Sequence, residues 1–326
     1  MTAAGKSNLQ GAGLALTAFA IYATHDVAVK TLGGVYSPVQ IIFFSVLLGF
    51  PLVTIMLMRD EAVDNLRPRH IGWTVLRTLA TLITGVTAFY AFSVLPLAQT
   101  YAILFAAPLL ITLLAIPVLG ERVGIRRGLA VVVGLCGVLI VLRPGQAELG
   151  LGHAAALTAA TASSLASVIV RKIGQMERAA VLILYPMTAN FLAMGLALPF
   201  VYRPMPVADL GLIAIIALFG FAGMLLIIAA YRRGEAVVVA PMQYSQMLWA
   251  ALFGAIFFDE SIDRYTMIGA GVIIASGIYI VLRESFSTAS RNRPVLQSRG
   301  RPETGTAPRS SAMQRGLKGR PDATTP

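Results

Sequence analysis

An apolar segment near the start of the chain recurs with few changes in the second half. Residues 11–33 and 152–174 align without a gap and share eight identical positions. The offset of 141 residues also places Lys30 opposite Arg171. About 20 mainly apolar residues cross a bilayer, so each copy begins with a predicted transmembrane helix. Internal repeats of membrane helices are the usual construction of secondary transporters, whose substrate sites lie between the repeats.

Two shorter matches extend the repeat to the end of each half. Residues 141–143 recur as 281–283 at an offset of 140, and Glu121 is matched by Glu260 at an offset of 139. The sequence therefore predicts two five-helix repeats followed by a tail, at residues 11–142, 151–283 and 284–326.

The composition agrees with an all-α integral membrane protein. Hydrophobic residues make up 57% of the chain and charged residues 13%, with a mean hydropathy of +0.76, whereas about a quarter of the residues in soluble domains carry charge. The single cysteine excludes an intramolecular disulfide. Ten transmembrane helices are predicted, at residues 11–31, 38–58, 71–93, 98–119, 124–142, 151–171, 180–201, 209–230, 237–257 and 264–282.

The distribution of basic residues predicts the orientation. With the N-terminus inside, the four cytoplasmic loops hold eleven lysines and arginines, and the five outward loops hold four. The positive-inside rule then predicts a multi-pass membrane protein with both termini in the cytoplasm. Because five is odd, the second repeat enters from the opposite side, with Glu121 inside and Glu260 outside. Inverted repeats of this kind favour alternating access.

The C-terminal tail has a different composition. Residues 283–326 carry nine lysines and arginines, three acids and few large apolar side chains. Such a segment cannot bury enough apolar surface to fold, so residues 284–326 are predicted to be disordered. The tail is either attracted to anionic lipid or simply solvated.

Asp26 is the only carboxylate predicted deep within a span. A charge near the bilayer centre costs about a few kcal/mol or more, so such a residue is a functional candidate. Lys30 lies one helical turn further on and is able to pair with Asp26. Asp26 either handles substrate or protons, or forms a structural ion pair with Lys30. His25 either joins a proton relay or hydrogen-bonds to another helix.

Amide and aromatic side chains mark a candidate cavity. Gln243, Gln246 and Trp249 follow i, i+3, i+6 spacing on the ninth predicted span, the fourth of its repeat. The fourth helices of the two repeats are expected to meet near the pseudo-two-fold axis. These polar groups either contact substrate or form interhelical hydrogen bonds. The candidate substrate-binding residues are Asp26, Gln99, Tyr101, Asn190, Gln243, Tyr244, Gln246 and Trp249.

The matched acids Glu121 and Glu260 are the clearest motif of the repeat. Both follow the end of an apolar span, which places them at helix termini. We expect them to cap helices, or to pair with Arg122, Arg126 or Arg264, rather than to contact substrate.

Several other function classes lack sequence support. No GxxxxGK[ST] phosphate loop is present, which leaves ATP-driven pumping without a basis. The three histidines lie on different segments and no nucleophile–base pair is visible, so neither an enzyme, a metal site nor a cofactor is expected. A channel would need rings of carbonyls or charges. The expected partners are a small-molecule substrate and the lipid bilayer, with no nucleic acid; a homodimer is left open.

The chain also resembles a known family. The stretch Ala91–Ala98, followed by Ala106-Ala107-Pro108 and residues 119–122, is similar to the pattern of EamA-type members of the drug/metabolite transporter superfamily. The second copy keeps Ala236 and residues 259–260, and has Met247 where the first has Pro108. The resemblance covers residues 11–283. It implies secondary transport, without ATP, of small organic molecules such as amino acids, nucleotide-like metabolites, vitamins or drugs.

Three segments give a narrower resemblance. Residues 24–30, 99–101 and 243–246 look most like branches that contain bacterial riboflavin importers and S-adenosylmethionine uptake carriers. Amides and aromatic rings suit a planar, largely uncharged heterocycle, because rings stack on flat faces and amides read polar edges. Riboflavin is therefore the first expected substrate, ahead of S-adenosylmethionine, amino acids or drugs. Import and export are not distinguished.

The topology is testable with reporter fusions. Reporters at the C-terminus and within residues 59–70 are expected to be active only in the cytoplasm, and one within residues 144–149 only outside. Activity and localisation of each fusion can be measured in cells. A cytoplasmic signal from residues 144–149 would contradict ten helices arranged as inverted repeats.

Overall fold

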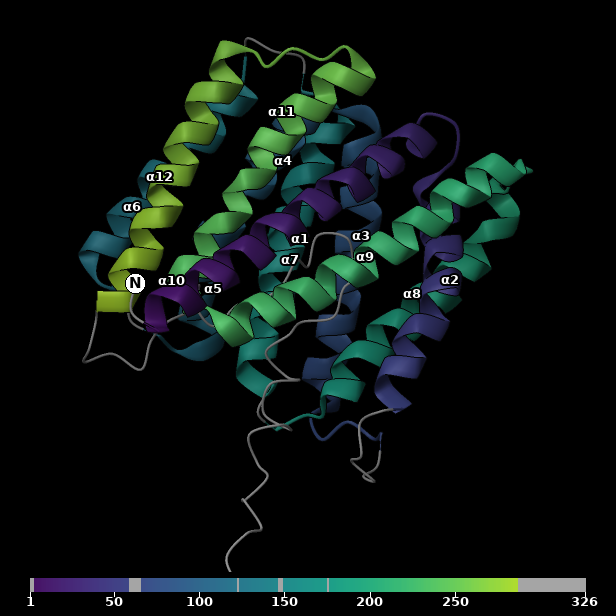
Figure 1. The fold of residues 1–326 in the computed structure, drawn as a ribbon, viewed down its shortest axis with the longest axis horizontal. Coiled ribbons are helices and arrows are strands. Elements are labelled where there is room, and N and C mark those ends of the chain that lie inside the picture. The colour runs from purple at the N-terminus through teal and green to yellow at the C-terminus, as the bar shows by residue number, and fades with distance from the viewer. Residues whose placement is uncertain (1–2, 59–65, 122, 146–148, 175, 287–326) are drawn as a thin grey trace, which may run out of the picture.

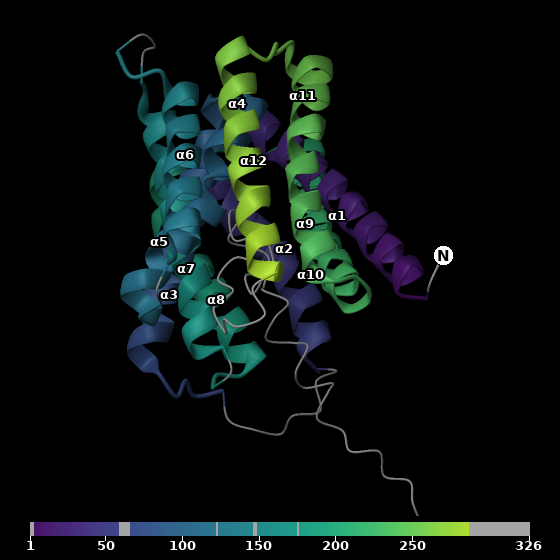
Figure 2. The same cartoon turned by 90° about the vertical axis from the view of Figure 1, so that its left-hand side faces the viewer.

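The computed structural model describes residues 3–58, 66–121, 123–145, 149–174 and 176–286. The first three residues of the predicted tail, 284–286, belong to the last helix, and the rest of the tail lies outside the described residues. Within these ranges the chain forms helices and no strands. Nine of the described helical segments are long and apolar enough to cross a membrane. Figures 1 and 2 show these helices gathered into one elongated bundle, with the loops at its two ends.

The helices follow the predicted spans closely. Leucine, alanine, valine and isoleucine fill them, and exposed large apolar side chains are spread over most of the bundle, as expected of a surface that meets lipid. The elements are α1 (Ala3–Gly33), α2 (Pro38–Met58), α3 (Ile71–Val94), α4 (Leu97–Leu104), α5 (Ala107–Leu119), α6 (Ile125–Leu142), α7 (Leu151–Ile173), α8 (Ala179–Val201), α9 (Val207–Arg233), α10 (Ala236–Val239), η1 (Ala240–Tyr244), α11 (Ser245–Phe258) and α12 (Arg264–Phe286).

Two of the ten predicted spans are not continuous α-helices. The fourth is interrupted between α4 and α5, and the ninth passes through the 3-10 helix η1 between α10 and α11. Proline favours both interruptions, because its ring removes an N–H donor and clashes with the carbonyl four residues earlier. Pro108 occupies the first turn of α5, and Pro241 the first turn of η1. Pro186 and Pro199, in contrast, lie within α8.

The tightest helix packing joins the two halves of the chain. α1 packs along α9, α3 along α7, and α6 along α12. α2 packs against α8, and the short segment α4 packs against both α11 and α7. Neither half therefore forms a separate bundle.

The bundle has two ends, which we name by their glutamates. Glu260, in the loop between α11 and α12, marks the Glu260 end; Glu121, between α5 and α6, marks the Glu121 end. The α11–α12 loop is at the top of Figures 1 and 2.

At each end, a hydrogen bond connects the two halves of the chain. At the Glu260 end, the Tyr36 hydroxyl donates to Asp209 over 2.6 Å, and this bond, with burial and the negative charge of Asp209, raises the pKa of Tyr36 above its usual value. At the Glu121 end, the backbone N–H of His70 donates to Glu177 over 2.5 Å. Both contacts join the loop after the first helix of one half to the start of the third helix of the other.

Small residues allow α6 and α12 to approach closely. A Cβ atom added to Gly269 would lie 2.6 Å from the Gly137 carbonyl oxygen and 2.5 Å from Val141. Gly271, two residues along α12, has open space around its Cα. The two glycines on the same helix therefore differ in what a methyl group would meet.

This difference predicts unequal effects on stability. Gly269→Ala is expected to destabilise the protein by about 1–3 kcal/mol, because the methyl group forces the helices apart. Gly271→Ala is expected to be neutral or slightly stabilising, since alanine is the better helix former. Thermal unfolding of the purified variants in detergent measures both. Equal melting temperatures would contradict the close contact of α6 and α12.

Candidate functional site

A buried acid lies at the centre of the candidate site. Asp26, on α1, is fully buried, as is His25 beside it. The Nδ1 atom of His25 lies 2.8 Å from Oδ1 of Asp26, and the Tyr101 hydroxyl donates a hydrogen bond to Oδ2. A carboxylate held in a low-dielectric interior needs such donors to offset its lost hydration.

The cluster extends to the second half of the chain. Nε2 of Gln246, on α11, donates to the Tyr101 hydroxyl oxygen over 3.4 Å. Phe92 of α3 packs edge-on against the Tyr101 ring, with 5.4 Å between the ring centroids. Asp26, Tyr101 and Gln246 thus bring α1, α4 and α11 together.

The interruptions of the fourth and ninth spans meet beside this cluster. Phe105 follows the last residue of α4, and Tyr244 is the last residue of η1. Their rings are in edge contact, with centroids 5.2 Å apart. The two positions are related by the same offset of 139 as Glu121 and Glu260. The phenol oxygen of Tyr244 reaches α12 at Gly277, where any side chain would collide with it.

The interrupted helices supply polar groups where a continuous helix would not. A break frees backbone carbonyls and N–H groups, which membrane proteins tolerate only where protein or a cavity satisfies them. Aromatic rings and the buried cluster surround these breaks. The arrangement suits a small organic ligand that offers flat faces and hydrogen-bonding edges.

Other predicted site residues lie apart from the cluster. Gln99 is within 3.1 Å of the His153 ring on α7, and Asn190 donates to Pro186 on its own helix, α8. Trp249 packs against Phe253, also on α11. Gln243 lies in η1, next to Tyr244.

The structure corrects the expected ion pairing of the first helix. Lys30 pairs with Glu260, over 2.7 Å, instead of with Asp26. His25 bonds to its neighbour Asp26, not to another helix, and its Nε2 atom is buried without a hydrogen-bond partner in the described chain. Glu121 pairs with Arg171. The observed partners of Lys30 and Glu121 come from the other half of the chain, which sequence spacing alone does not identify.

Glu121 and Glu260 are positioned by turns of the same kind. Gly120 and Asp259 both adopt left-handed conformations, with φ of 71° and 53°. The N–H of the following glutamate then bonds to a carbonyl six residues earlier, Ala115 or Gly254. This helix-ending turn fixes the backbone position from which each glutamate side chain extends. Glycine adopts the conformation freely, and aspartate is among the residues that tolerate it.

Sequence reasoning missed the aromatic residues around Tyr101. Phe92 and Phe105 look like ordinary apolar positions of a span. The signal that identifies Phe105 is its equivalence to Tyr244 in the repeat, together with Pro108 three residues later.

Comparison with known proteins gives a family. The sequence profile of the EamA-like transporter family matches residues 9–143 and, separately, residues 150–283. A crystal structure of another protein is similar to 87% of this chain and 99% of its own, with a TM-score of 0.58 and 18% identity, which supports the fold.

Several named relatives are similar over most of their length. An S-adenosylmethionine uptake transporter of Rickettsia prowazekii is 25% identical over 90% of this chain and 99% of its own. A riboflavin transporter of Rhizobium johnstonii is 28% identical over 66% and 72%, and a pseudopaline exporter of Pseudomonas aeruginosa is 24% identical over 82% and 94%. The family profile matches each half of the sequence once, and the two matches together cover most of the chain. The chain is therefore a multi-pass membrane protein that belongs to the EamA-like transporter family.

Proposed function

We propose that the protein is a secondary transporter of the bacterial inner membrane that moves a small organic metabolite by alternating access. It has ten membrane passes in two inverted five-helix repeats, with both termini in the cytoplasm. The observation that carries the proposal is the buried cluster of Asp26, Tyr101 and Gln246 beside two interrupted helices, because such interruptions are where transporters place their substrate sites.

The packing supports inverted repeats. When each helix is replaced by its counterpart in the other repeat, the pair of α1 and α9 becomes the pair of α7 and α3. The pair of α6 and α12 stays the same pair. The same replacement also turns the Tyr36–Asp209 contact into the Glu177–His70 contact at the opposite end. Two copies that share one packing scheme in opposite orientations are able to exchange conformations of similar energy.

Riboflavin is the first candidate substrate. Tyr101, Phe105 and Tyr244 offer aromatic faces for a planar heterocycle, and Gln246 offers an amide to its polar edge. The riboflavin transporter of Rhizobium johnstonii is one of the similar proteins. S-adenosylmethionine is the second candidate, because Asp26 supplies a buried negative charge for its sulfonium group.

Uptake into proteoliposomes tests the proposal. Purified protein is expected to exchange labelled riboflavin, and unlabelled riboflavin to compete more strongly than S-adenosylmethionine or amino acids. Empty liposomes are the control. Competition by S-adenosylmethionine alone would replace the flavin assignment, and exchange of no member of a metabolite panel would contradict the transport proposal.

The same vesicles test proton coupling. His25 leaves one ring nitrogen without a partner next to the buried carboxylate, which gives a proton acceptor on each residue. With an imposed pH gradient, Asp26→Asn is expected to lose accumulation and keep downhill exchange. Full accumulation by this variant would exclude Asp26 as the coupling residue.

The hydroxyl of Tyr101 is predicted to matter for transport. Tyr101→Phe removes the donor to Asp26 and the acceptor for Gln246, and a lost buried hydrogen bond costs about 1–3 kcal/mol. The apparent affinity for substrate is expected to fall about tenfold, as measured by uptake at varied concentration. Tyr279→Phe, on the exposed face of α12, is the matched control. Equal kinetics for the two variants would remove Tyr101 from the site.

A further inference from the structure

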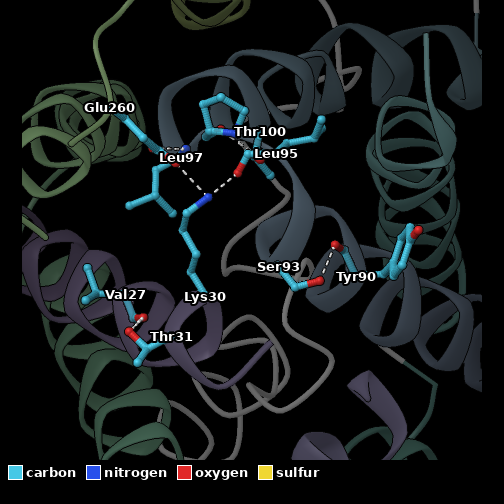
Figure 3. Close-up of polar contacts among 10 residues, drawn as sticks. Val27, Lys30, Thr31, Tyr90, Ser93, Leu95, Leu97, Thr100 and Glu260 are labelled. Carbon is cyan, nitrogen blue, oxygen red and sulfur yellow. Dashed lines mark hydrogen bonds and ion pairs between the residues drawn. The ribbon is translucent and has the colours of Figure 1, made fainter. Parts of the chain in front are cut away.

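Lys30 and Glu260 form an ion pair that holds a third segment of the chain. Their carboxylate and ammonium groups are 2.7 Å apart, with 11% and 18% of the side chains exposed. Lys30 also donates to the carbonyl oxygen of Leu95 over 2.5 Å, and the N–H of Leu97 donates to Glu260 over 2.9 Å. Figure 3 shows Lys30 reaching between the Leu95 carbonyl and Glu260. Residues 95–96, which we call the α3–α4 link, are therefore docked on this pair.

The other repeat carries the equivalent pair at the opposite end. Arg171 and Glu121, which pair with each other, occupy the positions that match Lys30 and Glu260. Lys172 adds a hydrogen bond to the Val118 carbonyl over 2.7 Å. The segment that matches the α3–α4 link is residues 234–235, the α9–α10 link, because each connects the third helix of its repeat to the fourth.

The two links are held alike on one side. A Cβ atom on Gly152, at the start of α7, would lie 2.9 Å from Leu95; one on Gly11, at the equivalent place in α1, would lie 2.6 Å from Gly234. Each link therefore packs closely on the first helix of the other repeat. The N–H of Glu235 also donates to Asn8 over 2.9 Å.

The two ends differ on the side of the ion pair. The Lys30–Glu260 pair is hydrogen-bonded to its docked link. The Arg171–Glu121 pair is just as buried, but a polar pocket of about 330 Å³ lies beside it. Its lining residues are Val118, Leu119, Glu121, Arg171 and Lys172. The packing agrees: among the described helices α4 packs against α11, whereas α10 and η1, the counterparts of α4, make no comparable contact with α5, the counterpart of α11.

We propose that the two ion pairs are alternating docking seats, and that the pocket beside Arg171 receives the α9–α10 link when the transporter opens at the Glu260 end. Glu235 is the exposed acid of that link, and Arg171 and Lys172 supply complementary charge in the pocket. In the structure described, the Glu260 end is docked and the Glu121 end is open. The inference rests on the proposed inverted repeats, and not on any particular substrate.

The exchange keeps the two states close in energy. Each ion pair stays intact during the exchange, because it lies at a helix contact that does not change: α1 with α11 for one pair and α7 with α5 for the other. No charge is therefore left unpaired in the bilayer. What changes is which link is bound, and each docking gives similar charge-assisted hydrogen bonds. Removing one seat therefore biases the equilibrium toward the state that uses the other.

Cysteine labelling tests the docking without substrate. Thr100 is fully buried on α4, one turn beyond the docked link. In a Cys136→Ser background, Thr100→Cys is expected to react slowly with maleimide in detergent. Adding Glu260→Gln is expected to raise the labelling rate about tenfold, since charge-assisted hydrogen bonds that hold the link are weakened. Lys30→Met is expected to act in the same direction, and Lys30→Arg to restore slow labelling.

Asp263→Asn is the matched control. Asp263 lies in the same loop as Glu260 and pairs over 3.0 Å with Arg143, the residue that follows α6. The bonds that it accepts from the backbone N–H groups of Tyr265 and Thr266 survive in asparagine. This variant is expected to label like the parent, and an equal rise would overturn the docking role of Glu260.

A variant in the α9–α10 link tests the opposite docking seat, because it is expected to change the labelling rate in the opposite direction. Glu235→Gln, added to Glu260→Gln, is expected to bring the labelling rate back toward the parent, because it weakens the competing docked state. General loss of structure would instead raise labelling further. An unchanged or higher rate in the double variant would overturn the pocket as the seat of the α9–α10 link. Riboflavin exchange plays no part in this readout, so its failure would leave the docking result standing.

Discussion

The absence of water from a bilayer interior is the constraint on which the rest of this structure depends. Every backbone donor and acceptor there has to be satisfied by the protein, which favours unbroken helices and makes each interruption costly. The chain nevertheless interrupts the fourth span before Pro108 and the ninth around Pro241. Because the interruptions meet at Phe105 and Tyr244, the freed polar groups share one protected region.

The buried polar side chains follow from the same constraint. Asp26 is retained in a span because His25 and Tyr101 hydrogen-bond to it, and Tyr101 is in turn contacted by Gln246. Removing a member leaves a buried group unsatisfied, so the network acts as a unit. It also ties α1 and α4, of the first repeat, to α11 of the second.

The helical architecture was predictable from sequence because apolar runs of about 20 residues leave little choice of structure. The spans and the polar positions Asp26, Tyr101 and Gln246 were identified in this way. The interruptions were not, since Pro186 and Pro199 sit inside α8 and proline alone does not decide. The partner of Lys30 was also missed: Asp26 lies one turn away, and Glu260 is brought near only by the packing of α1 against α11.

Pairing between repeats explains why the charges at the helix ends are tolerated. A lysine or arginine that ends the first helix of one repeat meets a glutamate placed by the left-handed turn after the fourth helix of the other. Both of these pairs join one repeat to the other, so each copy contributes to the stability of its partner. In the proposed mechanism, the docked link at one end and the pocket at the other supply the asymmetry that inverted repeats need for transport, because access closes at one face while it opens at the other.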